Sequence, residues 1–64
     1  MTTDNIKAVI RKWHANWNAW PTKSELVQTL LAMGFVVDSA ELDDLLGTLC
    51  AANELQVING TFVI

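Results

Sequence analysis

The chain ends in the stretch Leu55-Gln56-Val57-Ile58-Asn59-Gly60-Thr61-Phe62-Val63-Ile64. An Asn-Gly pair between two runs rich in β-branched residues is the strongest short-range signal for a β-hairpin, because a type I′ turn needs positive φ at both central residues. The sequence therefore predicts a C-terminal hairpin that turns at Asn59-Gly60.

The turn also fixes which residues of the hairpin face one another. The expected pairs are Ile58 with Thr61, Val57 with Phe62, Gln56 with Val63 and Leu55 with Ile64. One face of the hairpin is then uniformly apolar and consists of Leu55, Val57, Phe62 and Ile64. The outer face exposes Ile58 and Val63, and the last strand, residues 61–64, is expected to be an edge with free amides. We therefore expect self-association as a symmetric homodimer through this outer face.

Upstream of the hairpin, capping residues and leucine spacing predict two helices. Asp38-Ser39-Ala40-Glu41 is a capping signal. The leucine stripe that follows it, to about Asn53, consists of Leu42, Leu45, Leu46 and Leu49. Thr22-Lys23-Ser24-Glu25 has the form of a capping box and starts the earlier helix. That helix should end near Gly34, which stands where a left-handed C-terminal cap is needed.

A first helix is predicted over about residues 3–17. Its apolar positions recur at helical spacing and are Ile6, Val9, Ile10, Trp13 and Trp17. Thr3 or Asp4 can cap its start, and Pro21 lies beyond its end, because proline disfavours a helical residue before it. Since 64 residues leave no room for a second domain, we expect a single α+β domain over residues 1–64, with three helices and a hairpin.

This order of elements resembles a winged helix-turn-helix domain. The residues that carry the likeness are Pro21-Thr22-Lys23-Ser24-Glu25-Leu26 at the second helix, Leu42, Leu45 and Leu49 on the third, and Ala52-Asn53-Glu54-Leu55 before the hairpin. The resemblance implies that the short segment Trp20-Pro21-Thr22 can add a third strand. In that family the third helix commonly lies in the DNA major groove and the tip of the wing touches the backbone.

The third helix departs from that DNA-binding pattern. Its outward face consists of small and acidic residues, namely Ala40, Asp43, Asp44, Gly47, Thr48 and Ala51, with Glu41 at the edge. Affinity for DNA comes mainly from Lys and Arg on phosphates, so carboxylates facing the groove would repel it. We expect Glu41, Asp43 and Asp44 to stay solvated and unpaired. Together with Thr48 they are the expected contact with a basic partner, which the small residues would allow to approach closely.

Charge is divided between the two parts of the sequence, although the net charge is only −3. Residues 1–23 contain one acid and all four cations, which are Lys7, Arg11, Lys12 and Lys23. Residues 24–64 contain six carboxylates and no Lys or Arg. Such asymmetry bears on partners and association rates and not on the fold.

The three tryptophans allow two interpretations. They could form a platform for single-stranded bases beside the cations of the first helix. Alternatively, Trp13 and Trp17 continue the apolar stripe of that helix into the core, which their spacing already explains. We favour the core for Trp13 and Trp17, while Trp20 fits either role equally well.

No chemistry is expected from His14 or Cys50. One His and one Cys far apart in the chain make no metal-ligand set, so His14 should lie on the surface. Cys50 is close to the leucine stripe and should be a small buried hydrophobe. Asp43 and Asp44 are adjacent on a helix and diverge by about 100°, so they cannot share a substrate. We expect no enzyme, and no catalytic, metal-binding or cofactor-binding residues.

The sequence also bears on location. Its longest apolar run, residues 30–37, is far shorter than the ~20 residues of a membrane helix. The start Met1-Thr2-Thr3-Asp4 lacks the basic and apolar regions of a secretory signal, and the lone thiol fits a reducing compartment. We expect a cytoplasmic protein.

Two function hypotheses follow. The first is a non-catalytic protein–protein interaction module whose acidic third helix contacts a basic partner. It would be similar to small phage-type or accessory regulatory factors that occupy the nucleic-acid-binding surface of another protein. The alternative is a DNA- or RNA-binding regulator that lays its first helix on the backbone through Lys7, Arg11, Lys12 and Lys23. Four cations would make such binding sensitive to salt.

Overall fold

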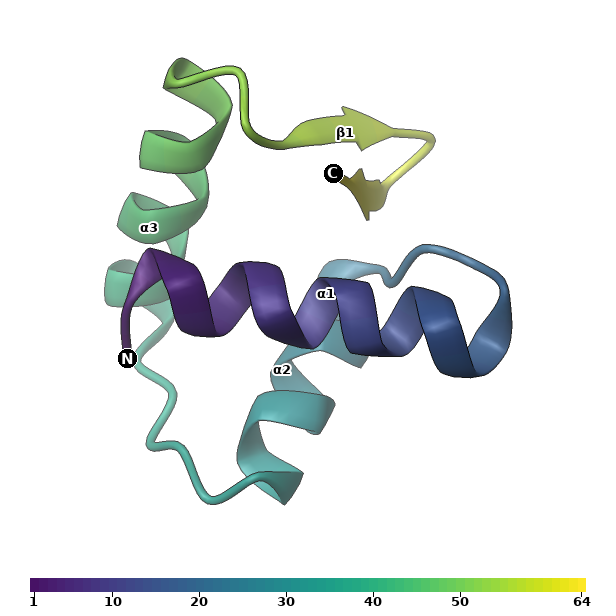
Figure 1. The fold of residues 1–64 in the computed structure, drawn as a ribbon. Helices are drawn as coiled ribbons and strands as arrows, with labels where there is room; N and C mark the ends of the chain where they lie inside the picture. The colour runs from purple at the N-terminus through teal and green to yellow at the C-terminus, as the bar shows by residue number, and fades with distance from the viewer.

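Three helices are followed by a two-stranded antiparallel hairpin in the computed structural model, which describes residues 1–64 (Figure 1). The elements are α1 (Thr3–Trp17), α2 (Lys23–Ala32), α3 (Ser39–Ala51), β1 (Gln56–Ile58) and β2 (Thr61–Val63). The predicted α+β class and order of elements are confirmed. None of the three helices combines the length and the apolar character that crossing a membrane requires.

Side chains cap the start of each helix. Thr22 and Glu25 form the predicted capping box of α2, in which the Thr22 hydroxyl accepts the Glu25 N–H at 3.3 Å and Glu25 Oε1 accepts the Thr22 N–H at 3.0 Å. The Asp38 carboxylate accepts the Ala40 N–H at 2.9 Å and caps α3. The prediction that Thr3 or Asp4 caps α1 is wrong: Thr2 is the cap, because Asn5 can complete a reciprocal box with it.

The hairpin has the predicted register, with Gln56 opposite Val63, Val57 opposite Phe62 and Ile58 opposite Thr61. Asn59 and Gly60 have φ values of 51° and 78°, as the turn requires.

The segment before α2 joins the hairpin as the resemblance implied. Thr22 forms an isolated antiparallel bridge with Thr61, and the Phe62 N–H donates to the Pro21 carbonyl at 2.8 Å. The prediction that β2 is a free edge is therefore wrong. Because β2 lies between β1 and the Pro21-Thr22 segment, the free edge of the sheet belongs to β1.

The core is formed by every element except β1, and its buried hydrophobic residues are Ile6, Val9, Ile10, Leu26, Leu30, Leu42, Leu46, Leu49, Leu55 and Phe62. In the connection between α2 and α3, Phe35 and Val37 pack against this core while Val36 points outward. Val57, expected on the inward face, is 57% exposed. Phe62 lies on the strand that joins the body of the domain, whereas Val57 lies on the outer strand.

Candidate interaction surfaces

The outward face of α3 consists of Ala40, Glu41, Asp43, Asp44, Gly47, Thr48 and Ala51, and we call it the acidic face. All seven residues are exposed, because Leu42, Leu46 and Leu49 turn the opposite side of the helix into the core. A Cβ added to Gly47 would meet no atom within 4 Å, so no other part of the chain approaches the helix there. At Gly47 the backbone of α3 is therefore exposed, with no side chain over it, beside the carboxylates.

One carboxylate of the acidic face is not free. Asp43 forms an ion pair with Lys23 at the start of α2, so the expectation that all three carboxylates stay unpaired is wrong for Asp43. The reason lies in tertiary structure, because the two residues are twenty positions apart in sequence and meet only where α2 and α3 pack. Glu41 and Asp44 have no cation within ion-pair distance. These two carboxylates remain available to a partner.

Ion pairing also divides the four cations. Lys7 contacts Glu54 at 3.2 Å and Asp4 at 3.7 Å, and Lys23 is held by Asp43. Arg11 and Lys12 are exposed and form no ion pair. Since adjacent residues on a helix diverge by about 100°, the side chains of these two cations leave α1 in different directions. The structure therefore does not gather the basic residues of the sequence into a single patch.

The spacing of Trp13 and Trp17 predicted that both residues belong to the core, but the structure does not place them there. The fully buried residues of α1 end at Ile10; Trp13 is half-buried and Trp17 is 66% exposed. Their rings are 5.6 Å apart between centroids and are tilted by 40°. The core interpretation is wrong for Trp17, because its indole borders an open groove and is not covered by a packed helix face.

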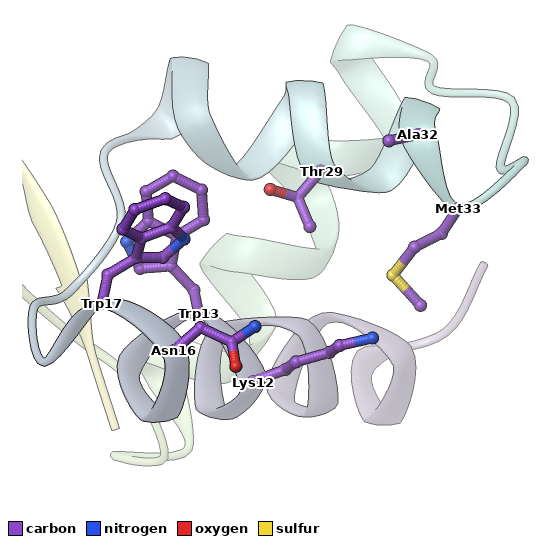
Figure 2. Close-up of a pocket in the computed structure, with 7 residues that line it drawn as sticks. All are labelled: Lys12, Trp13, Asn16, Trp17, Thr29, Ala32 and Met33. Atoms are coloured by element: carbon purple, nitrogen blue, oxygen red, sulfur yellow. The ribbon is translucent and has the colours of Figure 1, made fainter.

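These two indoles line an open groove of about 250 Å³ between α1 and α2, which we call the tryptophan groove. Its lining residues are Lys12, Trp13, Asn16, Trp17, Thr29, Ala32 and Met33. Figure 2 shows both indoles toward one end of the groove, with Met33 and the extended Lys12 side chain toward the other. The α2 wall was not predicted from the sequence, and Met33 in this wall is 50% exposed. No sequence signal marks this wall, since it depends on how α1 and α2 cross.

Trp20 is not part of this groove. It packs against the core, and its indole is stacked on the His14 imidazole at 3.9 Å with an interplanar angle of 5°. His14 was expected on the surface, but it is half-buried and its Nδ1 atom is buried with no hydrogen-bond partner. The stack explains this position, because the ring of Trp20 covers the imidazole.

The remaining candidates lie at separate places. Cys50 is exposed, so the expectation that it is buried is wrong: it follows Leu49 on α3 and is turned away from the leucine stripe. On the outer face of the hairpin, Ile58 is 48% exposed and Val63 is half-buried. No three His, Cys, Asp or Glu side chains lie close enough together to hold a metal ion.

No protein-family model, curated protein or solved structure matches this chain.

Proposed function

We propose that this protein is a non-catalytic protein–protein interaction module on a winged-helix scaffold, and that the acidic face of α3 contacts a basic surface of its partner. The observation that carries the proposal is the exposed row of carboxylates beside small residues, with Glu41 and Asp44 free of any cation. Such a field steers a basic partner and raises its association rate, most strongly at low salt. Regulation by occupying the nucleic-acid-binding surface of another protein would suit this chemistry.

The winged-helix assignment is supported by topology. Thr22, in the segment between α1 and α2, forms an isolated bridge with Thr61 of β2, at the place where the resemblance implies a third strand. DNA binding through the basic first helix is supported less well. Two of the four cations proposed for this binding, Lys7 on α1 and Lys23 on α2, are held by carboxylates of the same chain.

The test is capture of partners from an extract of the source cells with the immobilised protein. The charge reversals Glu41→Lys and Asp44→Lys should abolish capture of a basic protein and leave the fold intact, since neither side chain forms an ion pair. Asp43 is best left unchanged, because its reversal would also break the contact with Lys23.

Asp4→Lys is the control for charge: it makes the same change as either single reversal at a side chain that is 90% exposed, and although it removes the 3.7 Å contact with Lys7, that lysine keeps Glu54 at 3.2 Å. It should leave capture unchanged. If Asp4→Lys reduced capture as much as the other reversals, only net charge would matter. Capture of nucleic acid in place of protein would favour the alternative, DNA or RNA binding through the basic first helix.

We also propose self-association, through the edge of β1 and not through the edge of β2 that the sequence predicted. The Phe62 N–H points away from β1 toward Pro21, so Val57, its partner in the ladder, must direct its own backbone groups away from β2. Those groups form a short unpaired edge beside the exposed side chain of Ile58. A second copy could pair with this edge about a twofold axis, with Ile58 and Val63 on the adjoining outer face.

A further inference from the structure

We propose that the tryptophan groove binds single-stranded nucleic acid, with one base stacked on the exposed indole of Trp17 and a neighbouring phosphate on Lys12. This site is separate from the acidic face and does not depend on the proposed function. The first observation is the exposure of Trp17 itself. This indole is 66% exposed and contributes nothing to the core, and it lies in one apolar surface with Trp13 and with Met33, which is 50% exposed.

The shape and lining of the groove suit a base. At about 250 Å³ it is smaller than the cavities of roughly 300–1,000 Å³ that hold larger ligands, so it has room for one flat group. Its walls combine the rings of Trp13 and Trp17 with the polar side chain of Asn16. A base has the same combination, because its two faces are apolar and its edge forms hydrogen bonds. Stacking on an aromatic ring also tolerates any base.

The charges around the groove fit a phosphate. Lys12 is the only charged residue in the lining, it forms no ion pair, and no carboxylate lines the groove (Figure 2). Figure 1 shows α3 beside the N-terminal part of α1, whereas Trp17 ends that helix at its other end. A helix of this length spans about 22 Å, and salt screens charges beyond about 8 Å at physiological ionic strength. At the Trp17 end of the groove the field of the acidic face is therefore screened, and no carboxylate forms an ion pair with Lys12.

The site should prefer single strands to duplex. In a duplex the bases are paired and stacked on each other, so none of them is free to stack on the indole of Trp17. An acidic peptide with an apolar side chain is the competing occupant, since it would use the same indoles and the same lysine. The nucleic acid and the peptide differ in how much they depend on Trp17, because a stacked base needs an aromatic ring at this position.

The experiment measures binding of a dye-labelled oligothymidylate by fluorescence anisotropy at low salt, beside quenching of tryptophan fluorescence by the unlabelled strand. Wild-type protein should bind and be quenched. Trp17→Ala should weaken binding by about 5- to 150-fold, as expected for the loss of one stacked base, and Trp17→Phe should retain most of it. Lys12→Gln should weaken binding and lower the salt slope by about 0.7, the value for one phosphate on a single strand.

Lys7→Gln is the matched control, since it removes an equal charge from the same helix at a residue already paired with Glu54. It should leave both the affinity and the salt slope nearly unchanged. The proposal is overturned if wild-type protein fails to bind the oligonucleotide at millimolar concentration, or if Trp17→Ala binds as well as wild type. It is also overturned if duplex DNA binds equally well, or if a peptide of alternating glutamate and leucine displaces the strand at a similar concentration.

Discussion

The capping box at the start of α2 should be a principal local contribution to stability. Thr22 is half-buried, its hydroxyl accepts the Glu25 N–H, and the same residue bridges to Thr61 of the hairpin through its backbone. Thr22→Ala removes the hydroxyl and leaves the backbone bridge in place. Loss of such a cap costs about 0.5–2 kcal/mol, and the partial burial of the Glu25 N–H favours the upper half of that range.

A destabilisation of about 1–2 kcal/mol should be easy to measure in a domain of this size. Each kcal/mol lowers Tm by roughly 4–8 °C in domains of 60–100 residues, so Thr22→Ala should melt about 5–15 °C below the wild type. The assay is thermal unfolding followed by circular dichroism at helical wavelengths, with urea unfolding to obtain the free energy directly.

Two control variants make the result interpretable. Thr22→Ser keeps the hydroxyl and should stay close to wild type. Thr2→Ala removes the equivalent cap from α1, but Thr2 is exposed, so water can replace its hydroxyl and the loss should be about 0.5 kcal/mol. The reasoning is refuted if Thr22→Ala is as stable as wild type. It is also refuted if Thr22→Ser is as damaging as Thr22→Ala, since the methyl group and not the hydroxyl would then be responsible.

Three further predictions concern other parts of the molecule. Gly60→Val should destabilise the hairpin by about 1–2 kcal/mol, measured by urea unfolding, because Gly60 has a φ of 78° and a β-branched residue resists it; unchanged stability would contradict a type I′ turn. His14→Phe should unfold at a temperature equal to or above that of wild type, since the ring can still stack on Trp20 and the unpartnered Nδ1 atom is removed; a marked loss of stability would show that this nitrogen has a role. Ile58→Lys should turn any dimer into a monomer in sedimentation experiments, and a dimer that survives it would rule out the outer face of the hairpin.

Local chemistry explains which features could be predicted from the sequence. The Asn59-Gly60 turn, the box formed by Thr22 and Glu25, and the leucine stripe of α3 each depend on residues within a few positions of one another. Backbone conformation and hydrogen bonds over such short separations are properties of the residues themselves. The class, the order of elements and the hairpin register follow from them.

The features that the sequence did not predict were decided by packing, that is, by which parts of each helix other elements cover. Trp17 has the spacing of a core residue, yet α1 and α2 leave an open groove at this position and the indole stays exposed. The partner of Asp43 is on another helix, and periodicity cannot show that Lys23 meets it. The free edge of the sheet was predicted on β2 but lies on β1 for the same reason. The Phe62 N–H donates to the Pro21 carbonyl only once the chain has folded back. Side-chain periodicity gives the direction in which a residue points, and only the assembled structure determines what lies in that direction.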